Sequence, residues 1–144
     1  MKGRGGQSAI DLFSVHTNSG VTIEMLNIVD IKTGFQVVAP IKSKHPGIVA
    51  QALELVWFSW AGPPESCAAD NGGEFLQEVQ RLLEGMGVKQ FHTAVEAPWQ
   101  NGRCERLGGV WKEAWAKICI DQSLEGRADA ALTATIITRV RNEL

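Results

Sequence analysis

The stretch that decides the fold is SAIDLFSVHTNSGVTIEMLNIVDIKTGFQVVAP, residues 8–40. It holds three segments rich in β-branched and other apolar residues, which we expect to be strands. These segments are 8–16, 21–30 and 35–40. The turn-forming sequences Asn18-Ser19-Gly20 and Thr33-Gly34 separate them, and such short connections join antiparallel neighbours. The stretch therefore predicts a three-stranded antiparallel meander.

Helical and strand patterns alternate in the rest of the chain. We expect a buried helix at 47–61, a strand at 65–69, a helix at 73–86, a strand at 88–92, a loop at 93–102, and helices at about 103–121 and 127–143. A meander followed by strand–helix alternation predicts an α/β fold with a mixed five-stranded sheet flanked by helices. The length of 144 residues suits one domain, 8–144, behind a flexible lead-in at 1–7.

The composition argues against several classes of protein. No apolar run is long enough to span a bilayer, and the lead-in lacks the apolar stretch of a secretory signal. Cys67, Cys104 and Cys119 form no C-x-x-C pair, which predicts a reducing compartment and no zinc site. The net charge of −2 is unlike that of proteins that hold DNA unaided. A DNA-binding chain would need a local basic surface or further segments.

Three carboxylates are candidates for chemistry. Asp11 lies in an apolar strand, where a buried carboxylate is costly unless it is paired or metal-bound, although an edge-strand Asp facing water would also fit. Asp70 follows the fourth strand, before Asn71-Gly72, so turn chemistry explains it equally well. Glu105 opens the helix at 103–121, where the helix dipole favours an acid. Together they would suit two Mg²⁺ ions, which need no side-chain nucleophile.

The helix at 103–121 has two distinguishable faces. Its apolar face is Leu107, Val110, Trp111, Ala114 and Ile118, and its other face is Glu105, Gly108, Gly109, Lys112 and Ala116. A glycine inside a helix costs about 1 kcal/mol relative to alanine. We interpret the glycine face as one that a ligand backbone approaches, with Lys112 near a phosphate. The alternative is that the glycines serve packing.

Three stretches carry a resemblance to a known family. They are AIDLF at 9–13 with LNIVDIKTGFQ at 26–36, AADNGGEF at 68–75, and APWQNGRCERLGGVWKEAW at 97–115. In this order, they resemble the catalytic core of the integrases of retroviruses and LTR retrotransposons, which are polynucleotidyl transferases with a ribonuclease H-like fold. Asp70 and Glu105 are separated by 34 residues, one fewer than is usual in the family. Glu96 is therefore the rival third carboxylate.

The resemblance implies that Asp11, Asp70 and Glu105 bind two Mg²⁺ or Mn²⁺ ions, process the 3′ ends of element DNA and join them to target DNA. It implies DNA contacts by Gln100, Asn101, Arg106 and Lys112. It also implies a homodimer or higher oligomer, a particle found in nucleus and cytoplasm, and a fragment of a longer polyprotein. The alternatives are a degenerate core that only dimerises or binds DNA or protein, and a ribonuclease H-like nuclease acting on RNA–DNA hybrids.

The remaining aromatic and titratable residues have plainer interpretations. Trp57 and Trp60 lie on a helix that is apolar nearly all round, so we expect core packing and, beyond it, a homodimer interface. We expect Trp99 to pin its loop, with stacking on a base as the alternative. Asp30 is interpreted as structural. His16 and His92 are interpreted as solvated or satisfied.

Overall fold

The computed structural model describes residues 6–62, 64–69, 73–85, 87–88, 90–93, 98–122 and 127–143. Its strands are β1 (Gln7–His16), β2 (Thr22–Asp30), β3 (Gln36–Ile41), β4 (Ser66–Ala69) and β5 (Gln90–Thr93). Its helices are α1 (Pro46–Leu53), the π-helical η1 (Glu54–Phe58), α2 (Ser59–Ala61), α3 (Gly73–Gly85), α4 (Pro98–Asp121) and α5 (Arg127–Glu143). Within these residues, no helix is long and apolar enough to cross a bilayer.

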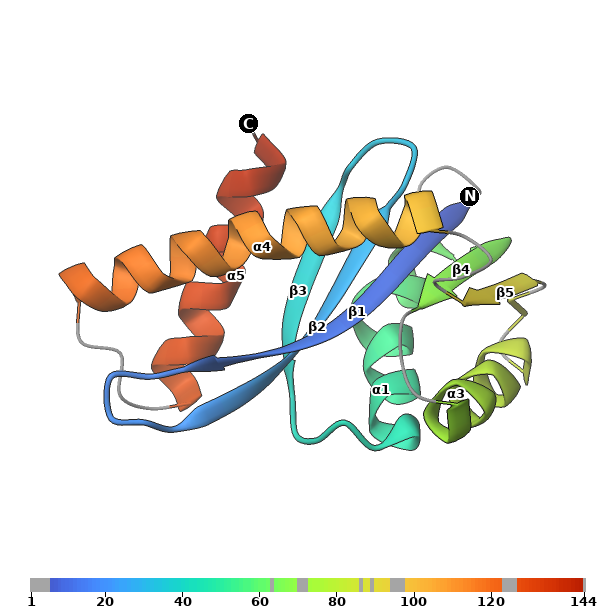
Figure 1. The fold of residues 1–144 in the computed structure, drawn as a ribbon, viewed down its shortest axis with the longest axis horizontal. Helices are drawn as coiled ribbons and strands as arrows, with labels where there is room; N and C mark the ends of the chain where they lie inside the picture. The colour runs from blue at the N-terminus through green and yellow to red at the C-terminus, as the bar shows by residue number, and fades with distance from the viewer. Residues whose placement is uncertain are drawn as a thin grey trace.

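The five strands form one mixed sheet in the order β3-β2-β1-β4-β5 (Figure 1). The pairs β1–β2 and β2–β3 are antiparallel, and the pairs β1–β4 and β4–β5 are parallel. This confirms the predicted fold class. The short strand β4 is paired with Gln7–Ile10, so its last described residue, Ala69, lies beside Ile10. The parallel half of the sheet thus ends one residue before Asp11.

Helices cover both faces of the sheet because side chains alternate along each strand. Ile10, Leu26 and Ile28 pack on one face against α1, η1 and α3. Phe13, Met25 and Val38 pack on the other face against α4 and α5. Figure 1 shows α4 running across β1 and β2. A residue at the ends of β1 or β4 that points to this second face therefore meets α4.

The predicted helix at 47–61 is present as the continuous run α1–η1–α2. Trp57 is 0% exposed and belongs to the core cluster between this helix and the sheet. The predicted core packing of Trp57 is therefore confirmed, and this side chain is not part of any surface left for the expected homodimer interface. The Trp60 side chain lies outside the described residues. Among the described side chains of this helix, Leu55 is the large apolar one that is exposed, at 67%.

The predicted loop at 93–102 is wrong in its second half, since α4 already begins at Pro98. Proline suits the first turn of a helix, where its missing N–H needs no partner. Asn101 donates from Nδ2 to Glu105 Oε1 at 3.1 Å, one turn along, which adds a side-chain bond within the helix. Trp99, Gln100 and Asn101 are therefore helical residues, and Glu105 lies in the second turn of α4.

Candidate active site

Asp11 points toward α4 from the middle of β1. Its neighbours at alternate positions, Ala9 and Phe13, pack in the clusters under that helix, so Asp11 shares their face. Across the antiparallel pair, Asp11 is opposite Asn27. The Asp11 side chain is half-buried. The predicted position, a carboxylate in an otherwise apolar strand, is therefore confirmed, and it faces a helix.

Glu105 lies on α4 directly after the buried Cys104, and its side chain is exposed. Burial raises the pKa of the Cys104 thiol well above its usual range, and the negative charges of Asp11, of Cys67 and of Glu105 raise that pKa further. The geometry agrees, because Asn27, the cross-strand partner of Asp11, donates from Nδ2 to the main-chain carbonyl of Cys104 at 3.1 Å, directly before Glu105. The fold thus brings together residues 94 positions apart, from β1 and from α4.

Asp70 and its rival Glu96 both lie outside the described residues. The strand that leads to Asp70 ends at Ala69, beside Ile10 and next to Asp11. Within the described part of the chain, no group of three or more His, Cys, Asp or Glu residues could hold a metal ion. The structure describes two members of the predicted triad, and it brings those two together.

The chemistry around the two carboxylates suits a hard cation. Asn101 is 5% exposed, its Nδ2 is used on Glu105, and its Oδ1 is buried with no hydrogen-bond partner among the described residues. Gln100 Oε1 is likewise buried with no hydrogen-bond partner among the described residues. Carboxylate and amide oxygens are the ligands that Mg²⁺ and Ca²⁺ accept. The donor set therefore fits a magnesium-type ion.

The predicted faces of this helix are partly wrong. Gly108 is buried, and a Cβ added there would lie 3.0 Å from Asn27 Nδ2 and 3.6 Å from Phe13 Cε2. The sheet, and not a ligand backbone, takes the space that Gly108 leaves. Val110, assigned to the apolar face, is 42% exposed. Gly109 has nothing within 4 Å of an added Cβ, so it remains on the open side with Glu105 and Lys112.

Neither a protein-family model nor a curated protein sequence matches the chain. Several solved structures, however, are similar to it. A chain of the simian T-cell lymphotropic virus intasome, in complex with PP2A regulatory subunit B56 gamma, is similar with a TM-score of 0.79 and 18% identity over 100% of this chain and 51% of that one. The dimeric HTLV-2 integrase catalytic core domain with magnesium is similar with a TM-score of 0.70 and 21% identity, over 91% of this chain and 83% of that one.

The fold is that of an integrase catalytic core. The trimeric form of the HTLV-2 core with magnesium is also similar, with a TM-score of 0.67 and 21% identity over 90% of this chain and 82% of that one. The chain spans about half the length of the intasome chain that it resembles. Asp11 and Glu105 thus converge in an integrase-core fold.

An exposed aromatic and cationic surface adjoins Glu105 in this integrase-core fold. Trp99, Arg103, Arg106 and Leu107 line a hollow of about 350 Å³ on α4. Trp99 is 65% exposed, so the interpretation that it pins a loop is wrong. Arg103 is fixed, because its Nη1 donates to the carbonyl of Ile31 in the β2–β3 turn. The hollow thus has two arginines in its lining although the chain as a whole carries a net charge of −2.

Lys112 lies on the same helix, two turns beyond Glu105. It is exposed, and its Nζ lies 5.2 Å from the centroid of the Phe13 ring. A cation over an aromatic face is attracted by the ring's electrons, which holds the lysine near β1. The predicted DNA-binding residues Arg106 and Lys112 are thus both on exposed parts of α4.

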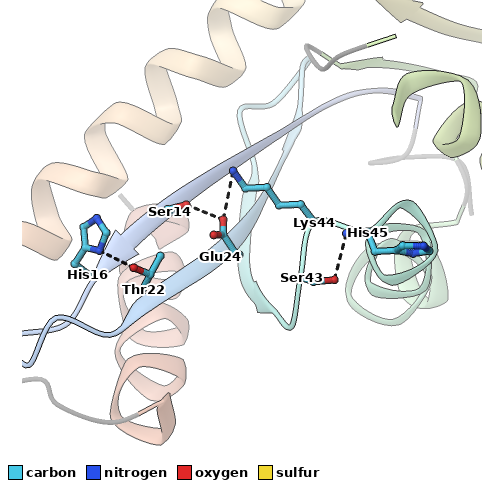
Figure 2. A network of polar contacts seen from close by, with 7 residues as sticks. All are labelled: Ser14, His16, Thr22, Glu24, Ser43, Lys44 and His45. Carbon is cyan, nitrogen blue, oxygen red and sulfur yellow. Dashed lines mark hydrogen bonds and ion pairs between the residues drawn. The ribbon is translucent and has the colours of Figure 1, made fainter. Parts of the chain in front are cut away.

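Several other polar groups of the β1–β2 hairpin have structural partners (Figure 2). Glu24 accepts a hydrogen bond from Ser14 Oγ at 2.7 Å and forms an ion pair with Lys44 Nζ at 3.5 Å. The exposed His16 has its Nδ1 3.1 Å from Thr22 Oγ1, so its predicted status as solvated or satisfied is confirmed. The His92 side chain lies outside the described residues.

Asp30 also has a structural partner, since its Oδ2 accepts a hydrogen bond from Thr33 Oγ1 in the turn after β2. Two residues near the site escaped the sequence interpretation altogether. They are Asn27 and Gln36, both 0% exposed and both on strands. A polar residue at a strand position that alternation assigns to the interior is the signal that marks them.

Proposed function

We propose that this chain is the catalytic core of a retroelement integrase, a polynucleotidyl transferase that processes the 3′ ends of element DNA and joins them to target DNA. The observation that supports the proposal is that the contact of Asn27 with Cys104 sets the Glu105 segment of α4 against the strand beside Asp11, next to the end of β4, in an integrase-core fold. Asp70, which follows β4, is the proposed third carboxylate.

Asp11, Asp70 and Glu105 would hold two Mg²⁺ or Mn²⁺ ions. The two HTLV-2 cores similar to this chain were solved in complex with magnesium, which supports a divalent cation. Such ions activate an attacking oxygen and stabilise a leaving one. Asn101 orients Glu105 through its amide hydrogen bond, and its Oδ1 is buried with no hydrogen-bond partner among the described residues.

The proposed reaction has two steps on phosphodiesters. In the first, water attacks a phosphorus near the element 3′ end and displaces the 3′ oxygen of the retained strand, which leaves a 3′-hydroxyl on the element DNA and a 5′-phosphate on the short piece that is released. In the second, the new 3′-hydroxyl attacks a target phosphorus and displaces the adjoining 3′ oxygen. Arg106 and Lys112 would hold phosphates, with Trp99 offering a face to a base and Gln100 a polar contact.

We propose a homodimer or higher oligomer in a particle found in nucleus and cytoplasm. The similar solved structures are a dimer, a trimer and an intasome, which supports self-association. On α5, Leu132, Ile136 and Val140 follow one another at every fourth position and are 42–63% exposed. We place the contact with the second copy on this stripe. Ile136→Glu should therefore shift the sedimentation of the chain toward the monomer.

The test is a Mn²⁺-dependent disintegration assay on a branched DNA oligonucleotide, which reads the reversal of strand transfer. Wild type, Glu105→Gln and Glu113→Gln are compared, because Glu113 is an exposed carboxylate two turns further along α4. The proposal expects activity in wild type and Glu113→Gln and at least a hundredfold loss in Glu105→Gln. Cleavage of RNA–DNA hybrids alone would indicate the nuclease. Folded wild type without activity or Mn²⁺-linked stabilisation would indicate a degenerate core.

A further inference from the structure

Two fully buried polar side chains lie beneath the carboxylate pair. Asn27 is on β2 and Gln36 is on β3, and both are 0% exposed. Asn27 is the direct cross-strand partner of Asp11, so the two side chains stand next to each other on the face that α4 covers. Most buried amides in folded proteins are hydrogen-bonded. Both polar atoms of the Asn27 amide are, and so is Gln36 Nε2, whereas Gln36 Oε1 is buried with no partner among the described residues.

Asn27 connects the strand beside Asp11 to the helix that carries Glu105. Its Nδ2 donates to the main-chain carbonyl of Cys104 at 3.1 Å and lies 3.5 Å from the Cys104 sulfur. Its Oδ1 accepts from Gln36 Nε2 at 2.8 Å. The amide is thus held from both sides. The carbonyl that it binds belongs to the residue directly before Glu105.

Gly108 provides the space for this contact. It is one turn after Cys104 on the same side of α4, and a Cβ there would come 3.0 Å from Asn27 Nδ2. A side chain at this position would crowd the Asn27 amide, so that the amide or the helix would have to shift by a few tenths of an ångström. The helical glycine, which costs stability in isolation, therefore allows an approach that a side chain would prevent.

Gln36 is itself anchored at the edge of the sheet. Its main-chain N–H donates to Asn142 Oδ1 at 2.9 Å, and its main-chain carbonyl accepts from Asn142 Nδ2 at 2.6 Å. Asn142, near the end of α5, thus pairs with β3 as a neighbouring strand would. The hydrogen-bonded path runs from α5 through Gln36 and Asn27 to the main chain of α4.

We infer that Asn27, held by Gln36, is a positioning residue that fixes the Cys104–Glu105 segment of α4 over Asp11, so that both carboxylates can share bound cations. This inference rests on the proposed function. Asn27 acts through the main chain of α4 and touches no reacting atom. Its removal leaves all three carboxylates in the chain but loosens the distance between two of them.

The test separates positioning from stability with shape-matched variants. Asn27→Val together with Gln36→Met replaces both partners by apolar groups of similar reach, and such paired replacements are nearly neutral for stability. The control is Thr138→Val. It removes a buried bond between α4 and α5, from Trp111 Nε1 to Thr138 Oγ1 at 3.3 Å, away from Glu105. Calorimetric titration with MnCl₂, urea unfolding and amide hydrogen exchange are measured on each folded protein.

We expect the double variant to unfold near the wild-type urea midpoint, to bind Mn²⁺ about tenfold more weakly and to exchange the amides of the first half of α4 faster. Thr138→Val should lower the urea midpoint and leave the Mn²⁺ dissociation constant unchanged. An unchanged Mn²⁺ constant in the double variant would overturn the positioning role while the proposed function stands. If wild type gives no binding heat with Mn²⁺, the proposed function fails and the positioning role fails with it.

Discussion

Gly108 and Gly109 are adjacent on α4, and the structure assigns opposite outcomes to the same substitution at each. A Cβ at Gly108 would lie 3.0 Å from Asn27 Nδ2 and 3.6 Å from the Phe13 ring, whereas a Cβ at Gly109 would meet nothing within 4 Å. The Asn27 amide has little freedom to move because hydrogen bonds hold both its ends. Alanine at Gly108 therefore displaces either the amide or the helix.

The magnitudes follow from the contacts. Glycine to alanine inside a helix gains about 1 kcal/mol from propensity at either position. At Gly108 the 3.0 Å contact also displaces Asn27 Nδ2 and so weakens the bonds from Asn27 to Cys104 and from Gln36 to Asn27, which contribute about 1 kcal/mol each. If Gln36 Nε2 is left without an acceptor, about 1 kcal/mol more is lost. Gly108→Ala should lower the free energy of unfolding by about 1–2 kcal/mol, and Gly109→Ala should raise it by about 0.5–1 kcal/mol.

The measurement is equilibrium unfolding in urea, monitored by tryptophan fluorescence, on wild type and both variants. Asn27→Ala supplies a further control, because in that background the added methyl group has room and Gly108→Ala should cost less than it does alone. A Gly108→Ala variant as stable as Gly109→Ala would refute the reasoning. It would mean that α4 does not approach β2 as closely as the hydrogen bonds require.

Three further predictions test other parts of the fold. When the native protein is titrated with a disulfide reagent, only Cys119 should react, and it should react slowly because burial raises its pKa. The unfolded chain should show all three thiols. Reaction of a second thiol in the native state would contradict the burial of Cys67 and Cys104. Gly34→Ala should destabilise by about 2 kcal/mol in urea, since Gly34 has a φ of +77° and an added Cβ would lie 2.9 Å from Arg103 Nη2; Gly20→Ala, with a φ of +85° and open space, should cost less. Asn142→Leu should destabilise by about 1–3 kcal/mol and raise the hydrogen exchange of α5, because both its bonds to the main chain of β3 are lost; unchanged exchange would refute the anchoring.

Much of the fold can be read from local patterns in the sequence. The meander follows from apolar segments separated by glycine-containing turns, and the last helix, expected at 127–143, is α5 with those bounds. The π-helical turn inside the helix at 47–61 has no comparable local signal. The start of α4 was mispredicted because Asn101 and Gly102 are usual loop residues, while the bond from Asn101 to Glu105 forms only once the helix exists.

In the candidate site, too, some residues can be predicted from local sequence, and others depend on contacts between distant parts of the chain. Asp11 and Glu105 were predicted because a carboxylate in an apolar strand and an acid at a helix start are visible locally. The roles of Asn27 and Gly108 could not be predicted from the sequence, because Asn27 contacts Cys104, which lies 77 positions away in the chain. The faces of α4 were assigned from hydrophobicity alone. Hydrophobicity cannot show that the Asn27 amide of β2 fills the space beside Gly108.

The central claim is that Asp11 and Glu105, together with Asp70, form one divalent-cation site. The most direct measurement is an anomalous-difference map from crystals of the chain grown with MnCl₂. The account predicts anomalous peaks about 2.1 Å from carboxylate oxygens of all three residues, and their loss in Glu105→Gln. Well-defined density for the three carboxylates with no manganese peak between them would contradict it.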